Sequence, residues 1–414
     1  MLNEMTERRP GFYGRMCIDT SMPVLILGGK ENALSLVRSL GRLGISVGVS
    51  GPDNCWALGS KFCSARYPVP DGMPSKDFWA SLLLGDGAAI KTPHVLLACC
   101  DNSLEFLAEH EAALRKRFVF DEAPAAQRLA LLDKQRTLEL AAEAGTAAPK
   151  FWPVARGEET DAEFEGCQFP LIVKPRNTFD FAKVFGKKFF LEKESPAELR
   201  QRIQEAHDHG FDVSVVEQIP GPDELLSSYY TYIDKSGAPL FHFTKRIFRR
   251  YPVNSGGATY HATEWLPETA QEGLNFFRNT GFRGLGNIEF KRDLRDGKLK
   301  IIEVNARFTA AEELAVQSGV PIDLIVYCHL TGQLVPTFAS YEADKRFWYP
   351  VKDFLSFVEM RRAGQLGFRG WIRSLKISRH VSPLFDPSDL RPGLTAVSSI
   401  VRKLLASRKA AWGG

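Results

Sequence analysis

Two acidic side chains and an amide lie within apolar segments in the second half of the chain. Glu289 lies in the segment NIEF, and Glu303 and Asn305 lie in IIEVNAR. Charged groups inside apolar strands need a compensating partner. Oxygen-only ligands suit Mg²⁺, which keeps several waters and bridges a few carboxylates to substrate phosphates. We therefore predict that Glu289, Glu303 and Asn305 hold one or two Mg²⁺ ions, with Mn²⁺ as a substitute; two exposed glutamates on a surface hairpin are the alternative.

The pairing register of the two segments decides whether these side chains can meet. Glu303 and Asn305 are two residues apart and therefore project from the same face of a strand. A three-residue loop at 295–297, with Gly297 in the left-handed conformation, would pair Glu289 directly with Glu303. A two-residue turn without a bulge would place Glu303 on the opposite face. We predict the three-residue loop.

Lysine and arginine residues occupy positions that are costly without an anionic partner. Lys174 lies in the aliphatic run LIVKP, where a nucleotide phosphate or a salt bridge would compensate it. Lys134 opens a helix, where the macrodipole disfavours a cation; taken alone, it is more simply a solvated side chain. Segment 245–250 carries four cations before a Pro/Gly loop. It indicates a solvated face, a nucleic-acid patch or, beside a metal-phosphate site, a site for a carboxylate or developing negative charge.

The segment VVEQIPGPDE (215–224) is an apolar strand that ends in a turn. Such an edge could offer backbone carbonyl and amide groups to a purine, with Glu224 in reach of ribose hydroxyls. A plain strand-to-turn connection explains it equally well.

The apolar periodicity predicts an open α/β layer followed by an α+β region. Residues 23–50 read as strand, helix and strand, and 95–117 as a further strand and helix. Gly28 and Gly29 do not form a G-x-G-x-x-G fingerprint, so a tight turn explains them better than a dinucleotide site. Beyond Asp133, strands and helices alternate less regularly, and the chain after about residue 338 is mostly helical with proline breaks.

Composition and charge limit the class of protein. The 414 residues, 44% hydrophobic and 25% charged, predict two or three globular domains and exclude a disordered or collagen-like chain. The net charge of +4 is unevenly spread: residues 361–414 contain 11 Lys/Arg and two acidic residues, and the remainder is mildly acidic. The seven cysteines show no C-x-x-C spacing, and the polar N-terminus lacks a secretory signal. We therefore expect a cytoplasmic protein with reduced thiols.

Five short segments, in this order, resemble the ATP-grasp superfamily: DK (133–134), PLIVKP (170–175), VVEQIPG (215–221), GNIEF (286–290) and EVNAR (303–307). Within it, segments 23–45 and 243–252 are similar to the carboxylate–amine ligase branch that includes D-aspartate ligases. The resemblance implies a mixed α/β and α+β fold: an N-terminal Rossmann-like pre-ATP-grasp domain, two subdomains that clasp ATP, and a basic helical C-terminal segment. The implied boundaries are 1–20 for a flexible extension, 21–120 for the pre-ATP-grasp domain, 121–335 for the ATP-grasp domain and 336–414 for the C-terminal segment.

The resemblance also implies a role for each matching residue. ATP would be bound by Lys134, Lys174, Glu217, Gln218, Ile219 and Glu224, and Mg²⁺ by Glu289, Glu303 and Asn305. Arg307 and Arg249 would be catalytic, stabilising the transferring phosphate and the intermediate, and Lys245 and Arg246 would bind substrate. Two features depart from the pattern: Ile247 occupies a position that is often lysine in the closest branch, and the loop after Lys174 has one glycine where many relatives have several.

The implied function is an ATP-dependent, ADP-forming ligase that activates a small-molecule carboxylate as an acyl phosphate and joins it to an amine. A carboxylase or another acyl-phosphate enzyme with a different acceptor and a non-catalytic nucleotide-binding module remain alternatives. A nicotinamide-dependent oxidoreductase would need a better glycine fingerprint and does not explain the E-x-N pattern. No nucleic-acid partner is expected. For the basic segment 398–412, a helix docked on the body is favoured over peripheral contact with an anionic membrane.

Overall fold

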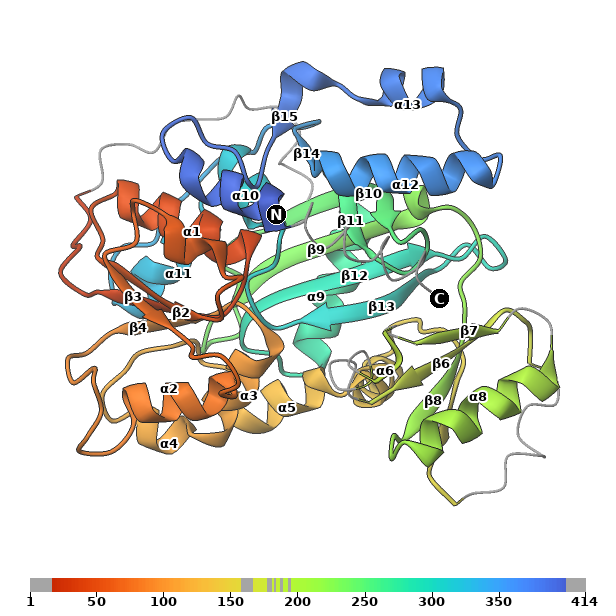
Figure 1. Ribbon diagram of the computed structural model, residues 1–414, viewed down its shortest axis with the longest axis horizontal. Helices are drawn as coiled ribbons and strands as arrows, with labels where there is room; N and C mark the ends of the chain where they lie inside the picture. Colours follow the sequence, from red (N-terminus) through yellow and green to blue (C-terminus); the bar gives the residue numbers. More distant parts are fainter. Residues whose placement is uncertain are drawn as a thin grey trace.

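The computed structural model describes residues 17–157, 167–176, 181, 184–186, 189–192 and 195–399. The predicted extension therefore lies mostly outside the described residues, as do part of the loop after Lys174 and the chain beyond Ser399. Three sheets organise the described residues (Figure 1). No described helix is long and apolar enough to cross a membrane.

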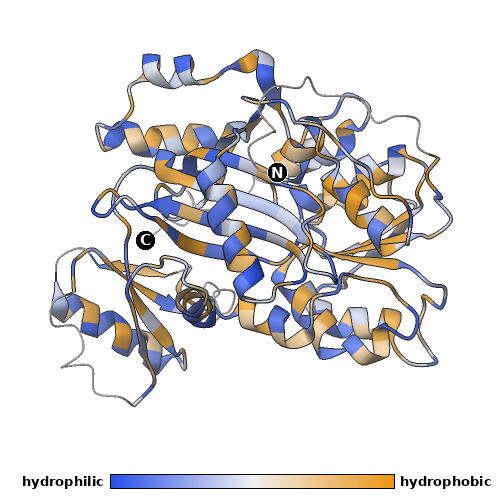
Figure 2. Cartoon of the chain, turned by 180° about the vertical axis from the view of Figure 1, so that it is seen from behind, coloured by the Kyte–Doolittle hydropathy of each residue, from blue (hydrophilic) through white to orange (hydrophobic). Residues whose placement is uncertain are grey.

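The N-terminal domain is a parallel four-stranded sheet in the order β3-β2-β1-β4; the apolar periodicity predicts β1, β2 and β4 but not β3. Strands β1 and β4 are hydrophobic along their length because helices cover both faces of such a sheet, whereas β3 at one edge is partly exposed (Figure 2). The strands are β1 (Val24–Leu27), β2 (Val47–Gly51), β3 (Ala65–Pro68) and β4 (Val95–Ala98). The helices are α1 (Glu31–Arg42), η2 (Trp56–Gly59), α2 (Ser75–Leu83), α3 (Asp101–Glu109) and α4 (Glu111–Leu114), followed by α5 (Ala125–Leu132) and α6 (Lys134–Glu143).

The turn between β1 and α1 explains the glycine pair. Gly28 and Gly29 both have positive φ, at 73° and 90°. A Cβ on Gly28 would lie 2.4 Å from Cys100 Sγ, and one on Gly29 would lie 2.6 Å from Cys99 Cβ. Only glycine combines that backbone with so close an approach to the end of β4, so the pair serves a tight turn.

The small subdomain is a four-stranded antiparallel sheet in the order β5-β8-β6-β7 with one long helix. Its elements are β5 (Phe151–Val154), β6 (Leu171–Pro175), β7 (Phe190–Glu192), α8 (Pro196–Asp208) and β8 (Val213–Glu217). Ser195 caps α8, because its side chain accepts a hydrogen bond from the Glu198 amide. This sheet has a hydrophobic core of its own, separate from the rest of the molecule.

The central sheet has seven strands in the order β13-β12-β9-β10-β11-β14-β15, antiparallel except for the last pair. The strands are β9 (Leu226–Ile233), β10 (Phe243–Tyr251), β11 (Gly257–Thr263), β12 (Gly284–Arg292), β13 (Leu299–Asn305), β14 (Arg346–Trp348) and β15 (His380–Val381). The helical elements are η3 (Asp223–Leu225), α9 (Pro267–Asn279), α10 (Glu312–Gln317), α11 (Ile322–Leu330), α12 (Pro350–Arg362), α13 (Phe368–Ser374) and η4 (Ile377–Arg379). Two continuous hydrophobic cores join this sheet to the N-terminal domain.

The C-terminal segment is mostly helical, as predicted, but it is integrated into the body. It adds β14 and β15 to the central sheet and lays α12 against β10 (Figure 1). Asp386 and Asp389, the two acidic residues of 361–414, form salt bridges with Arg42 and Arg38 of α1. These two strands are three and two residues long, too short to show an apolar periodicity in the sequence.

Candidate active site

A cavity of about 580 Å³ lies between the small sheet and the central sheet. Strands β6 and β8 form one wall, β10 to β13 form the other, and the N-terminal domain adds Glu31 and Asp101. This volume is in the range of sites that bind small molecules. Most of the predicted site residues line the cavity: Lys134, Lys174, Glu217, Gln218, Ile219, Lys245, Glu289, Glu303, Asn305 and Arg307.

The paired carboxylates lie on the hairpin of β12 and β13. Glu289 stands directly opposite Glu303, and Asn287 stands opposite Asn305. The predicted pairing of Glu289 with Glu303 is therefore confirmed, and both carboxylates reach the same cavity as Asn305.

The route to that register differs from the prediction. The backbone bonds of Asp293 with Lys298 and Gly297 close a four-residue loop at 294–297, so the predicted three-residue loop is wrong. With this four-residue loop, Phe290 pairs with Ile301, which by itself would pair Glu289 with Ile302. A β-bulge between Glu289 and Phe290 leaves Ile302 unpaired as an extra residue of β13, and Glu289 therefore pairs with Glu303. Gly297 has the predicted left-handed conformation, with φ 73°. A bulge inside a strand leaves no reliable sign in the sequence.

Lys134 reaches across to these carboxylates. Its Nζ donates to Glu303 Oε1 at 2.5 Å, and its side chain is 15% exposed, so it is not a solvated surface residue. Asp133 removes the conflict with the helix dipole, because its carboxylate caps α6 by accepting from the amides of Gln135 and Arg136. The DK pair thus supplies a helix cap and an active-site cation at adjacent positions.

Strand alternation explains the position of Lys174 in the opposite wall. Leu171 and Val173 point into the small-subdomain core, so Ile172 and Lys174 face the cavity. On the neighbouring strand Glu217 is 5% exposed, and Arg295 of the hairpin loop lies 3.7 Å from its carboxylate. The two sheets are thereby linked by charge across one end of the cavity.

Lys291 is a cavity residue that the sequence analysis missed. Its Nζ donates to the carbonyl of Ile219 at 2.9 Å and to that of Gly221 at 2.7 Å. Burial, with nearby Arg250 as a second cause, lowers the pKa of Lys291 to about 8. The alternation of β12 places it on the face of Glu289, two residues away, which is the signal that could have identified it.

His261 is a second missed residue, located on β11. It is 1% exposed and lines the cavity beside Lys245, which is itself 3% exposed. Neither ring nitrogen has a hydrogen-bond partner among the described residues. Burial, and then the charge of Lys245, hold the pKa of His261 well below its usual range, so the ring is neutral. A neutral imidazole can donate and accept one hydrogen bond each to a ligand.

Strand β10 separates its four cations between two faces. Its register with β11 shifts after Ile247, leaving Phe248 as an extra residue. Lys245 and Arg250 therefore reach the cavity, whereas Arg249 turns to the opposite face.

Two predicted roles on β10 need correction. Arg249 was predicted to be catalytic, but both its Nε and Nη2 donate to Asp353 of α12, at 2.7 and 3.0 Å. Arg249 is 3% exposed and does not line the cavity. Arg246, predicted to bind substrate, also does not line this cavity and pairs with Glu264 at 2.7 Å. Simple alternation along a strand without a bulge would have kept Arg249 on the face of Lys245.

Glu224, predicted to reach a ribose, is exposed on η3 and does not line the cavity. Its neighbour Asp223 is buried and binds Arg250, with Nη2 and Oδ1 2.8 Å apart. The short 3₁₀ turn therefore directs Asp223 inward and Glu224 outward, and the order of the two acids in the sequence does not indicate which one points inward.

Arg307 lies where the EVNAR segment leaves the sheet. Its Nε donates to Asp101 Oδ1 at 2.7 Å, at the start of α3 in the N-terminal domain. Asp101 and Glu303 raise the pKa of Arg307 against the opposing effect of burial. The guanidinium is thus held at the junction of the N-terminal domain and the carboxylate pair.

The donor set fits a magnesium ion. Glu289, Glu303 and Asn305 present oxygen atoms only, from adjacent strands into one cavity. No described cluster of three or more His, Cys, Asp or Glu side chains is arranged to hold a metal. A site with two carboxylates would therefore depend on the amide, water and phosphate oxygens for its remaining ligands, which is the usual mode for Mg²⁺.

Comparison with known proteins agrees with this architecture. No family model matches the chain. A D-aspartate ligase from Enterococcus faecium is 22% identical over 286 residues, covering 64% of this chain and 66%, just under two thirds, of that ligase. The fold is similar to an L-amino acid ligase from Bacillus licheniformis (TM-score 0.55, 16% identity, 77% and 76% of the two chains). It is also similar to a biotin carboxylase from Campylobacter jejuni (TM-score 0.62, 14% identity, 78% and 74% coverage).

The chain thus has the ATP-grasp fold. Its sequence resembles the carboxylate–amine ligase branch and is similar to the enterococcal D-aspartate ligase.

Proposed function

We propose that this protein is an ATP-dependent, ADP-forming ligase that joins a small-molecule carboxylate to an amine. The observation that carries the proposal is the pairing of Glu289 with Glu303, beside Asn305, in a cavity between two antiparallel sheets. Lys134 and Lys174 face that cavity from two other elements. Carboxylates on one wall and lysines on the others match the needs of a nucleotide triphosphate with its metal ion.

The nucleotide would lie along the wall formed by β6, β8 and the two residues that follow β8, Gln218 and Ile219. Lys134 and Lys174 would contact its phosphates, and Glu217, Gln218 and Ile219 would border the base. Lys291 already binds the Ile219 carbonyl, so it would fix the position of this backbone edge. Glu303 would exchange part of its contact with Lys134 for the metal, which frees the ammonium for phosphate.

Glu289, Glu303 and Asn305 would hold Mg²⁺, which when bound neutralises phosphate charge and orients the γ-phosphate. Beside it, Arg307 would stabilise the negative charge that develops as the substrate carboxylate attacks that phosphate. Asp101 holds the Arg307 guanidinium by a 2.7 Å hydrogen bond, so the arginine needs little reorganisation during the reaction.

The acceptor side of the cavity is formed by β10 and β11. Lys245 and Arg250 are the cations of β10 that line it, so they take the place of Arg246 and Arg249 in the proposal. His261 would bind the substrate through its two ring nitrogens, which have no hydrogen-bond partner in the described part of the chain. An amine held there would attack the acyl carbon of the acyl phosphate, and phosphate would leave. The resemblance to a protein named D-aspartate ligase supports an amino acid as one of the two substrates.

A carboxylase is the second candidate, because a biotin carboxylase shares the fold. Both reactions pass through an acyl phosphate made with the same ATP site, so they differ in whether bicarbonate or an organic carboxylate is activated. ADP release that requires bicarbonate and no other carboxylate would favour this candidate.

The test is coupled ADP release with pooled carboxylates and amines, followed by mass spectrometry of the products. Glu303→Gln is expected to lower turnover by at least about 100-fold, because it removes a metal ligand's charge. Glu143→Gln is the matched control: Glu143 is 58% exposed on α6 and outside the cavity, and turnover should be unchanged. Near-normal ADP release by Glu303→Gln would refute the site. Nucleotide binding without release under any substrate pool would indicate a binding module instead.

A further inference from the structure

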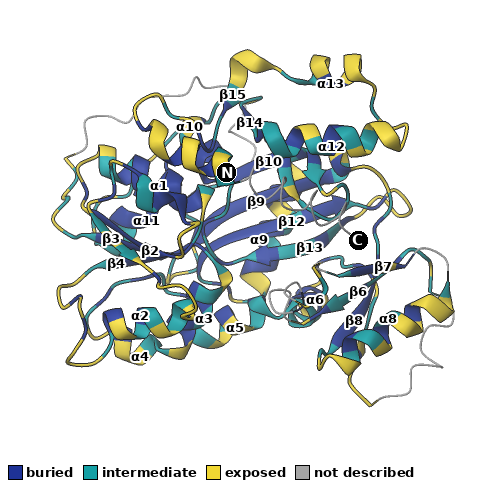
Figure 3. Ribbon diagram, in the orientation of Figure 1, coloured by how far each residue is buried: buried dark blue, intermediate teal, exposed yellow. Residues whose placement is uncertain are grey.

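The C-terminal segment contains a surface that the proposed ligase reaction does not use. Residues 360–385 contain no acidic residue. The part at 361–379, which we call the basic arm, connects α12 to β15 and is exposed at nearly every position, at the end of the molecule away from the small sheet (Figure 3). Six cations project from it: Arg361, Arg362, Arg369, Arg373, Lys376 and Arg379.

Most of this charge has no ion-pair partner among the residues that the structure describes. Lys376 pairs with Asp344 at 2.8 Å, and Arg379 approaches Glu342 at 3.7 Å. The other four guanidinium groups form no ion pair with any described residue. A surface of this kind attracts polyanions.

Large apolar side chains are exposed among the cations. Phe368 is 52% exposed, Ile372 46% and Ile377 72%. Phe354, on the adjoining α12, is 49% exposed. Leaving these groups in water gains nothing for folding, and a cluster of them marks an interaction surface.

The helix α13 sorts the two kinds of side chain into neighbouring stripes. Phe368 and Ile372 are four residues apart, as are Arg369 and Arg373, so each pair lies on one side of the helix. Trp371 anchors the arm instead: it is 9% exposed and stacks on Phe357 of α12, with ring centroids 4.7 Å apart. The arm is therefore held in place while its apolar and cationic stripes stay exposed.

We propose that the basic arm docks this protein on an anionic lipid membrane. An anionic membrane would bind both the apolar and the cationic side chains of the arm. The apolar side chains would enter the boundary between headgroups and acyl chains, and the adjacent cations would contact anionic headgroups. Nucleic acid would use the cations but would not account for exposed Ile372 and Ile377. Lys352, in the first turn of α12, lines the cavity, so a helix of about 20 Å connects the cavity rim to the docking surface.

The test is co-sedimentation of the full-length protein with vesicles of phosphatidylglycerol and phosphatidylcholine in equal parts. The wild type should pellet with these vesicles and not with pure phosphatidylcholine, and binding should weaken as salt is raised. Arg369→Glu with Arg373→Glu should lower the partition coefficient at least about ten-fold. Ile372→Ser with Ile377→Ser should also lower it, because the apolar contribution is lost.

The matched control reverses two exposed cations elsewhere, Lys91→Glu with Lys116→Glu, and should change binding less than about two-fold. All variants should keep the wild-type melting temperature and ATP turnover, which separates this proposal from the proposed function. Three outcomes overturn the proposal: equal pelleting with neutral vesicles, undiminished binding by the Arg369/Arg373 variant, or binding to duplex DNA without binding to vesicles.

Discussion

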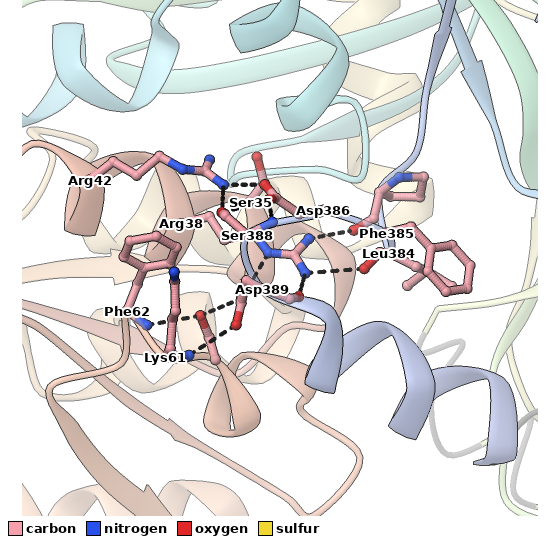
Figure 4. Close-up of polar contacts among 12 residues, drawn as sticks. Ser35, Arg38, Arg42, Lys61, Phe62, Leu384, Phe385, Asp386, Ser388 and Asp389 are labelled. Carbon is pink, nitrogen blue, oxygen red and sulfur yellow. Dashed lines mark hydrogen bonds and ion pairs between the residues drawn. The ribbon is translucent and has the colours of Figure 1, made fainter.

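Two charged regions of this molecule differ in how completely their polar groups are paired. In the junction between α1 and the C-terminal segment, Arg38 donates to the Asp389 carboxylate and to the carbonyls of Asp389 and Leu384 (Figure 4). Ser60 and the Lys61 amide donate to the same carboxylate at 2.7 and 3.0 Å. In the cavity, by contrast, buried His261 has no hydrogen-bond partner among the described residues.

The difference separates polar groups that hold the fold together from polar groups that are available to a ligand. A buried ion pair that is fully hydrogen-bonded fixes one arrangement of its elements, here the C-terminal segment on the N-terminal domain. A buried polar group without a partner is a cost that folding alone does not explain, and such groups concentrate where a ligand completes the site.

Among the tests of this comparison, Asp389→Ala is expected to have the largest effect on the free energy of unfolding. The change leaves the guanidinium of Arg38, 1% exposed, without its carboxylate, and should lower the free energy of unfolding by about 3 kcal/mol. Urea unfolding measures it. ATP turnover of the folded variant should stay within about two-fold of wild type, because the cavity is elsewhere.

The matched control is Arg42→Gln, which removes the neighbouring ion pair with Asp386. Arg42 is 36% exposed, so this change should cost at most about 1 kcal/mol. Equal losses for Asp389→Ala and Arg42→Gln would contradict the assignment of the buried pair as the structural one.

A smaller and opposite pattern is expected from His261→Leu. It removes two unpartnered buried nitrogens, so the free energy of unfolding should fall by no more than about 1 kcal/mol, whereas kcat/KM for the substrate should fall at least about ten-fold. The comparison variant is His242→Leu, whose imidazole bonds Tyr229 at 2.7 Å outside the cavity. That variant should lose stability and keep kcat/KM; a reversal of the two patterns would remove His261 from the site.

The last effect concerns Lys291 and pH. Because burial lowers its pKa in the folded state to about 8, from 10.5, the unfolded chain binds more protons between these values. The charged form therefore destabilises the fold below pH 8, and this cost is relieved as the pH rises toward 10. Relative to Lys291→Met, the wild type should gain about 1 kcal/mol or more in free energy of unfolding between pH 7.5 and 9.5. A difference that is independent of pH would show that Lys291 has an ordinary pKa.

The sequence alone predicted most of the elements and much of the cavity. Alternation and helical periodicity identified β1, α1, β2 and β4, because a buried parallel strand is a short continuous apolar run. The E-x-N spacing placed Glu303 and Asn305 on one face, since side chains alternate along a strand. Three predicted residues are misplaced. Arg249 lies next to a bulge and Glu224 in a 3₁₀ turn, where alternation fails, whereas Arg246 follows Lys245 on a regular part of the strand and alternation itself turns it to the opposite face.

The sequence by itself determined the features that depend on neighbouring residues along the chain. These are the type of each strand and helix, the helix caps at Asp133 and Ser195, and the faces of strands without a bulge. Only the tertiary structure decided which far-separated groups meet. The contact of Lys134 with Glu303 spans 169 residues, and that of Arg38 with Asp389 spans 351. The physical reason is that local periodicity specifies the direction of a side chain, whereas its partner is chosen by the packing of whole sheets and by bulges that shift their register.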